Sequence, residues 1–317
     1  MLQENSIKLS LSYAIASRVK DYFMMMKFTL TFMVVFSCVV AYLLVPGVEF
    51  DLIKVLLLFA GGILVSGSAN TINQILEKDT DKLMARTAVR PIPAGRLSVS
   101  EASIVALVAG IAGITILGFG FPVATGAGTV QVFGYGFNWL SAGLSLFSLL
   151  LYGFVYTPWK KWNSLAVLIG AIPGALPLLI GWAAGAGTLS EGGWALFAIQ
   201  FLWQFPHFWA IAWVAHTDYT KAGFKLMPTD RGPGKMIALQ AAMYTMLLIP
   251  AGVAPYLLGM TGAVSAVVAI LIGGFYLWRA IELYRKCDVP SARKLMFGSY
   301  IYLAVILLAL LFDKVKL

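Results

Sequence analysis

Asn73, Glu77 and Asp81 are spaced four residues apart, so on a helix they form one stripe of oxygen-bearing side chains. An amide followed by two carboxylates suits Mg²⁺, which prefers oxygen ligands and commonly bridges to the phosphates of a substrate. The same spacing fits a solvated helix end at which Lys78 and Lys82 serve as counter-ions. The spacing alone leaves both interpretations open.

Other polar groups stand at the ends of apolar segments. Arg86 and Arg90 follow the stripe, and arginine meets phosphate oxygens in pairs through its planar guanidinium group. Two further clusters, in HTDYTK and YTPWKK, contribute His216, Asp218, Tyr219 and Lys221, and Tyr156, Lys160 and Lys161. Charge at several helix ends above an apolar interior is what a membrane site for a diphosphate with a long apolar tail requires.

The elements that must position these groups are membrane helices. The chain of 317 residues is 60% hydrophobic and 12% charged, against about 25% charged residues in a soluble domain. Its mean hydropathy is +0.85. Because lipid cannot satisfy backbone groups, apolar runs of about 20 residues are expected to be helices. Nine spans are predicted, near 28–46, 53–73, 99–119, 138–156, 164–185, 193–214, 236–257, 262–281 and 295–312.

The lysines and arginines predict the orientation. All but three of the 23 fall on one face of the predicted topology, and the exceptions are Lys54, Lys314 and Lys316. This bias places the N-terminal segment 1–26, the stripe and the loop 216–235 in the cytoplasm, with the spans in the cell inner membrane. The net charge of +9 follows from the same bias and requires no nucleic acid.

The connecting segments carry few other signals. Residues 1–26 contain no signal-peptide core, and the glycine-rich, uncharged stretch 118–137 is predicted to be a plain loop on the opposite face. No room is left for a soluble domain, so residues 1–317 are predicted to form a single polytopic domain.

His207 follows Pro206 within the sixth predicted span. An ionisable side chain inside a span is costly and indicates function, and imidazole is a common ligand of heme iron. The imidazole could equally satisfy a backbone carbonyl that the proline kink leaves free. Position alone does not separate these interpretations.

The segment NQILEKDTDKLMARTAVRPIPAG resembles the first signature of the UbiA-type intramembrane prenyltransferases. The blocks VYTPWKK, GALPLLIGW, FLWQFPHFWAIAW and DYTKAGFKLMP follow in order and are similar to the members of that family that farnesylate heme. The resemblance covers residues 27–235 by motifs and the remainder by the number of spans.

The resemblance implies a UbiA-like fold, an all-α membrane protein with nine transmembrane helices around a central cavity. It implies that Mg²⁺ and the acidic motifs hold farnesyl diphosphate and that heme B is the acceptor. The product, heme O, would carry a hydroxyethylfarnesyl group in place of a vinyl group. A terminal oxidase or a heme A synthase would then receive it.

The resemblance also assigns residues. The implied metal ligands and catalytic oxygens are Asn73, Glu77, Asp81 and Asp218, and Lys161 matches the lysine of the YTPWKK block. The implied substrate-binding residues are Lys27, Arg86, Arg90, Tyr156, His207 and Lys221, with His207 contacting heme. The chain departs from the common pattern of the family at Glu77, where aspartate is usual, at Ala222 in place of a second aspartate, and at Phe28 and Thr29 in place of Pro-Arg.

Two alternatives remain at this point. The acceptor could be an aromatic quinone precursor, as in other members of the same family, although the PHFW and DYTKAG blocks favour heme. The chain could also be a secondary transporter, since broken helices and buried polar groups mark those proteins. A transporter is expected to place its charges near the middle of the membrane, whereas these carboxylates cluster at one face.

Overall fold

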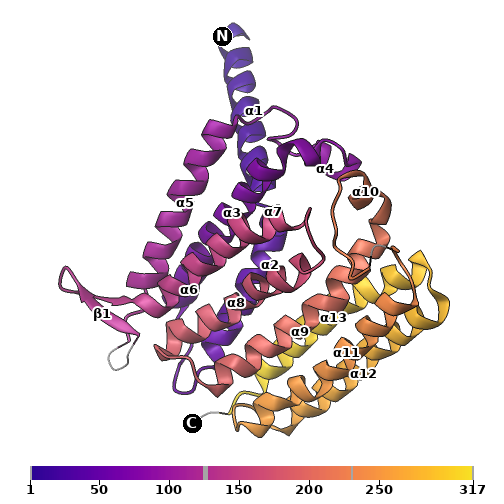
Figure 1. Cartoon of the computed structure of the whole chain (residues 1–317). Helices are drawn as coiled ribbons and strands as arrows, with labels where there is room; N and C mark the ends of the chain where they lie inside the picture. The colour runs from indigo at the N-terminus through magenta and orange to yellow at the C-terminus, as the bar shows by residue number, and fades with distance from the viewer. Residues whose placement is uncertain (1, 124–127, 230, 316–317) are drawn as a thin grey trace.

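The computed structural model describes residues 2–123, 128–229 and 231–315, with side chains from residue 13 onward. Long helices lie side by side in a bundle, with one β-hairpin at its edge (Figure 1). The long helices are α1 (Leu2–Met25), α2 (Phe28–Leu44), α3 (Leu52–Asp81), α5 (Val99–Phe119), α6 (Trp139–Leu150), α8 (Ala166–Ala186), α9 (Glu191–Val214), α11 (Lys235–Leu257), α12 (Ala263–Lys286) and α13 (Val289–Phe312). The short elements are α4 (Ala85–Ala88), β1 (Thr129–Val132), β2 (Tyr135–Asn138), the π-helix η1 (Leu151–Tyr156), α7 (Thr157–Trp159) and α10 (His216–Lys221).

Each of the nine predicted spans coincides with helix in the described part of the chain. Seven of those helical stretches are long and apolar enough to cross a membrane, and α1 with α2, bent by 53°, adds an eighth if the pair forms one span. Helix α9 is not among them, because Gln200, Gln204 and His207 lower its hydropathy. The chain is therefore a multi-pass membrane protein, with a span count close to nine.

The core sits where α2 meets its neighbours. Helix α2 packs against α3, α8 and α13, and α9 packs against α8, α11 and α13. The approach of α2 to α8 requires a glycine, since a Cβ added at Gly181 would collide with the carbonyl oxygen of Cys38. One apolar cluster is formed by residues of α2, α3, α5, α6 and α8, and a second by residues of α2, α8, α9 and α11–α13.

Two lysines outside the predicted basic face, Lys54 and Lys314, donate hydrogen bonds to carbonyls at the C-terminal ends of α5 and α2. The Lys314 ammonium donates hydrogen bonds to the carbonyl oxygens of Leu43, Val45 and Val48, at the end of α2, over 2.6, 2.9 and 2.8 Å. Lys54 donates to the carbonyl of Gly120, the C-cap residue of α5, over 2.6 Å. The last carbonyls of a helix have no partner within the helix, so these two lysines serve as hydrogen-bond donors to helix ends. Lys316 lies outside the described residues.

The stretch 118–137 differs from the predicted plain loop, because its second half forms an antiparallel hairpin of β1 and β2. Phe133 and Gly134 both have positive φ angles, of 52° and 80°, which is the geometry of a tight two-residue hairpin turn. Residues 124–127 lie outside the described part. The hairpin lies at the end of the bundle opposite to α4 and α10 (Figure 1).

Residues 1–26 were expected only as a charged segment, but almost all of them form α1. The helix breaks at Lys27, whose φ of 50° and ψ of 52° place it in the left-handed region. A lysine in this conformation is uncommon and marks a position that surrounding contacts must hold.

Candidate functional site

A cavity of about 230 Å³, here called the charged cavity, lies at the end of the bundle that carries α4 and α10 (Figure 1). Its walls come from the break between α1 and α2, α2, α3, the segment after α3, η1, the segment after α7, α8, α9, α10 and the loop after α10. The charged side chains that line it are Lys27, Glu77, Asp81, Arg86, Arg90 and Lys160. Segments separated by more than a hundred residues thus supply one group of charges.

The predicted stripe of oxygen ligands lies in this cavity. Helix α3 runs unbroken to Asp81, and Asn73, Glu77 and Asp81 all line the cavity while being only 1%, 4% and 1% exposed. The alternative of a solvated helix end is therefore wrong for these residues. It describes Asp79 instead, whose exposed carboxylate pairs with Lys82 over 3.2 Å.

Asp81 is fixed by the segment that follows it. An Arg90 guanidinium nitrogen donates to Asp81 Oδ2 over 2.7 Å, and the Thr87 hydroxyl donates to the Asp81 carbonyl over 2.8 Å. Asp81 Oδ1 is buried and has no hydrogen-bond partner among the described residues. A buried carboxylate oxygen without a partner is costly, so this atom is suited to receive a ligand.

Glu77 is paired with a lysine from another part of the chain. Lys160 Nζ lies 2.5 Å from Glu77 Oε1, and it also lies 4.9 Å from the ring centroid of Tyr156 and 5.3 Å from that of Phe224. The backbone N–H of Lys225 donates to the carbonyl of Lys160 over 2.7 Å, which ties the loop after α10 to this lysine. The ammonium group is thus held by a carboxylate and two aromatic faces.

The structure places Lys160 in the cavity and Lys161 on the exposed surface, which corrects the lysine expected from the sequence. The physical reason is the π-helix just before it. A π-helix has more residues per turn than an α-helix, so η1 shifts which later side chains face the interior. The same segment turns Tyr152 and Tyr156 together toward the cavity, with ring centroids 5.3 Å apart.

Lys27 reaches the stripe from the break between α1 and α2. Its ammonium donates to Asn73 Oδ1 over 3.0 Å, and the Asn73 amide donates to the Thr157 hydroxyl over 3.1 Å. The left-handed backbone at Lys27 is what directs this side chain into the cavity between helices.

Three residues proposed from the sequence, Lys161, Lys221 and Asp218, stand apart from this group. Lys161 and Lys221 are exposed, and neither lines the cavity. Asp218 is half-buried and does not line it, whereas the adjacent Tyr219 does. Among the described residues no three carboxylate, imidazole or thiol side chains could hold a metal ion together. The expected fourth ligand, Asp218, is therefore not assembled with Glu77 and Asp81.

His207 also faces elsewhere. Its Nδ1 lies 2.7 Å from the Ser299 hydroxyl of α13, and its ring stacks on Trp203 with centroids 4.5 Å apart. The Ser299 hydroxyl also lies within hydrogen-bond distance of the Met296 carbonyl, so it links His207 to the backbone of α13. His207 does not line the charged cavity, and in this structure it joins α9 to α13 rather than satisfying a carbonyl of its own helix.

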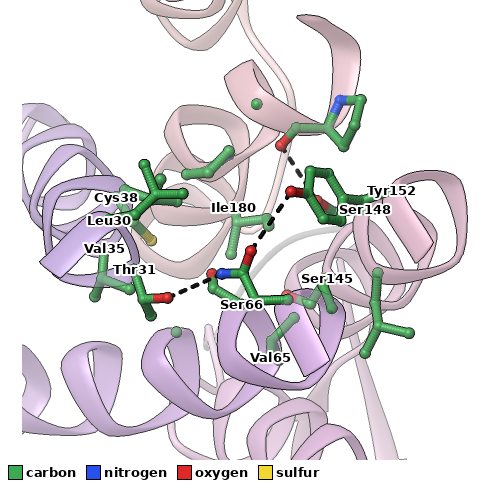
Figure 2. A pocket seen from close by; sticks show the side chains of 18 of the residues that line it. Leu30, Thr31, Val35, Cys38, Val65, Ser66, Ser145, Ser148, Tyr152 and Ile180 are labelled. Atoms are coloured by element: carbon green, nitrogen blue, oxygen red, sulfur yellow. Dashed lines mark hydrogen bonds between the residues drawn. The ribbon is translucent and has the colours of Figure 1, made fainter. Parts of the chain in front are cut away.

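A second, apolar cavity of about 100 Å³ adjoins the charged one. Leu30 and Tyr152 line both. Figure 2 shows its wall, where Val35, Cys38, Val65 and Ile180 stand among a few hydroxyl groups. Tyr152 was not anticipated, although its position four residues before Tyr156 at a helix end was a usable signal. Tyr219 had no signal beyond its place in the HTDYTK cluster, and Phe224 had none beyond its place in the DYTKAGFKLMP block.

The chain resembles known proteins over nearly its whole length. The UbiA prenyltransferase family matches residues 34–306. Two proteins named protoheme IX farnesyltransferase are similar to this chain. The protein of Cytophaga hutchinsonii is 44% identical over 95% of this chain and 99% of its own length. The protein of Flavobacterium psychrophilum is 41% identical over 95% of this chain and 96% of its own length.

Solved structures share the fold. Digeranylgeranylglyceryl phosphate synthase aligns with a TM-score of 0.74 at 18% identity, over 95% of this chain and 100% of its own. A UbiA homologue from Archaeoglobus fulgidus bound to GPP and Mg²⁺ aligns with a TM-score of 0.69 at 14% identity, over 92% of this chain and 99% of its own.

Proposed function

Because the chain belongs to the UbiA prenyltransferase family, we propose that it is an intramembrane enzyme that transfers a farnesyl group from farnesyl diphosphate to heme B. Water adds in the same reaction, and the products are heme O and diphosphate. The observation that carries this proposal is the likeness, at up to 44% identity over 95% of the chain, to proteins named for that activity. The charges of the site are consistent with it.

The charged cavity suits a diphosphate. Four cationic side chains and two carboxylates line it, which leaves an excess of positive charge for an anion. Arg86 and Arg90 can meet phosphate oxygens in pairs, and Lys27 and Lys160 add compact charges from the other walls. The diphosphate would bind between these groups.

The apolar cavity suits the start of the farnesyl chain. It adjoins the charged cavity at Leu30 and Tyr152, and its lining is mostly aliphatic. Its volume of about 100 Å³ is too small for the whole chain. Leu30 is 53% exposed, so the remaining isoprene units have a route past it toward lipid.

The residues present also fit a magnesium ion. Mg²⁺ in such sites is held by one or two carboxylates together with substrate phosphates, so the absence of a third acidic ligand among the described residues is no obstacle. Glu77 and Asp81 would hold it with Asn73, and Asp81 Oδ1 is an available oxygen. When bound, the ion would neutralise charge on the diphosphate. Asp218 remains a proposed contributor only if its segment moves.

In the proposed mechanism, Lys160, Arg90 and Arg86 stabilise the negative charge that develops on the departing diphosphate, a preorganised electrostatic effect. The bond between C1 and the diphosphate oxygen breaks, and its electron pair leaves with the diphosphate. The rings of Tyr152, Tyr156 and Phe208 line the cavity and can shield the allylic cation. The vinyl group of heme then supplies the electrons for the new carbon–carbon bond.

The remaining parts of the proposal concern cellular context. Residues 1–317 would act as a single domain in the cell inner membrane, with the N-terminal segment and the charged cavity on the cytoplasmic side. The bias of lysine and arginine toward that face supports this orientation. The product would pass to a terminal oxidase or to a heme A synthase.

The test uses membranes that contain the full chain, supplied with farnesyl diphosphate and heme B. Hemes are extracted and separated by chromatography, and diphosphate release is measured in parallel. Heme O and diphosphate should appear together, and at a fixed low Mg²⁺ concentration both should fall together in Asp81→Asn. A prenylated quinone precursor without heme O, or no diphosphate release, would contradict the proposal.

A further inference from the structure

Three polar side chains meet where the charged and apolar cavities join. The Asn70 amide nitrogen donates to Thr31 Oγ1 over 3.1 Å, and the Tyr152 hydroxyl donates to Asn70 Oδ1 over 3.5 Å. Asn70 is 5% exposed and Thr31 1%. Thr31 and Tyr152 stand on opposite sides of the apolar cavity in Figure 2, and dashed lines run from each toward the amide between them.

The hydrogen-bonding capacity of these three side chains is not fully satisfied by other groups of the protein. The Thr31 hydroxyl donates to the Met26 carbonyl over 2.8 Å and accepts from Asn70, which fixes the amide so that its oxygen faces Tyr152. The contact between Tyr152 and that oxygen is 3.5 Å, the upper limit for a hydrogen bond. At such a distance a water molecule can satisfy both groups better than they satisfy each other.

Two of the three serine hydroxyls that line the apolar cavity, those of Ser145 and Ser148, are committed. Ser145 donates to the Ser141 carbonyl over 2.7 Å. Ser148 donates to the carbonyl of Pro173 over 3.3 Å, an oxygen that the helix cannot satisfy because Pro177, four residues later, has no N–H. Asn70 and Tyr152 therefore retain hydrogen-bonding capacity that Ser145 and Ser148 lack, and the Ser66 hydroxyl is a third such group among the described residues of this wall.

The inference from Asn70 and Tyr152 rests on the proposed function, because that function places the reacting atoms beside these two groups. C1 of a prenyl diphosphate is bonded directly to the diphosphate. With the diphosphate in the charged cavity and the chain in the apolar one, the reacting carbons lie at the junction lined by Leu30 and Tyr152. Asn70 precedes Asn73 by about one turn of α3, on the apolar side of the stripe.

We propose that Asn70 and Tyr152 bind the water molecule that becomes the hydroxyl group of the product, with Thr31 as a positioning residue. After the vinyl carbon bonds to C1, a cation remains on the vinyl carbon next to the porphyrin. The water oxygen forms the carbon–oxygen bond with an electron pair, and the released proton passes to the departing diphosphate. Without held water, the cation loses a proton instead and gives a product lighter by one water molecule.

The experiment compares Tyr152→Phe and Asn70→Leu with the unmodified chain, in membranes supplied with farnesyl diphosphate and heme B. Mass spectrometry of the extracted hemes gives the ratio of the lighter product to the hydroxylated one. Tyr302→Phe is the matched control, since its buried hydroxyl also donates over 3.5 Å, to the Leu248 carbonyl, and lines neither cavity.

We expect the ratio to rise about tenfold in both variants, equivalent to about 1.4 kcal/mol in the competition between water capture and proton loss. The control should keep the unmodified ratio. An unchanged ratio in Tyr152→Phe, which removes one oxygen atom, would overturn the inference even if Asn70→Leu failed to fold. So would loss of both products in step with diphosphate release, because the groups would then serve substrate binding. If the unmodified chain farnesylates no heme, the proposed function fails instead.

Discussion

Lys160 Nζ lies 2.5 Å from Glu77 Oε1, and the two side chains are only 10% and 6% exposed, although 83 positions separate them in the chain. The next residue, Lys161, is exposed. Two adjacent lysines thus have different environments, and the pair offers an internal control for the role of charge in the cavity.

Lys160→Ala should lower the rate of diphosphate release by about 100- to 1000-fold, the usual effect of removing one preorganised group that stabilises developing charge. Lys161→Ala should leave the rate close to that of the unmodified chain. Turnover with farnesyl diphosphate and heme B is the measurement. Lys160→Arg retains both the charge and a partner for Glu77, so it should keep more of the rate than Lys160→Ala. Equal rates in the two alanine variants would contradict the assignment to Lys160.

Asp81→Asn should raise the Mg²⁺ concentration needed for half-maximal activity by about 100-fold, since even an outer partner of a metal ligand changes affinity by about 10- to 100-fold. Asp79→Asn is the control, because that carboxylate is exposed and pairs with Lys82. A titration of activity with Mg²⁺ after chelation checks both. Identical titration curves would remove Asp81 from the metal site.

Ser299→Ala should destabilise the protein by about 1 kcal/mol through loss of one buried hydrogen bond. His207→Ala should cost more, because it also removes a buried ring that stacks on Trp203, and the two effects should not add. Thermal unfolding in detergent of the single and double variants measures this coupling. Heme binding is followed by absorbance in the same samples. Loss of heme binding without loss of stability would favour the heme contact predicted from the sequence.

Lys314→Met should lower the unfolding temperature, because three carbonyls at the end of α2 lose their donor. Lys54→Met removes one such bond, to the Gly120 carbonyl, and should have a smaller effect. Unfolding followed by circular dichroism in one detergent compares the two. A larger shift in Lys54→Met would contradict the account of helix ends.

The apolar runs and the four-residue spacing were sufficient to predict the helices and the ligand stripe. Lipid allows few structures for such runs, and helical geometry then determines which residues share a face. The shared face of Asn73, Glu77 and Asp81 could be predicted because the three residues belong to one continuous helix. Burial of that stripe could not, because it depends on segments packed against it from elsewhere.

The residues from other segments that face the stripe were harder to predict. The π-helix at Leu151–Tyr156 has no clear signature in the sequence, and it decides that Lys160 rather than Lys161 faces inward. Similarly, Tyr219 and not Asp218 lines the cavity, because α10 begins after a break from α9 that resets the helical phase. The direction of His207 depends on Ser299, a residue 92 positions away.

The amide of Lys225 holds the loop after α10 against the carbonyl of Lys160. Since the main chain makes this bond, evolution can vary the side chain at position 225 without detaching the loop. Proline is the exception, as it has no N–H. A lineage that acquired proline there would loosen one wall of the cavity while every charged group in it kept its identity.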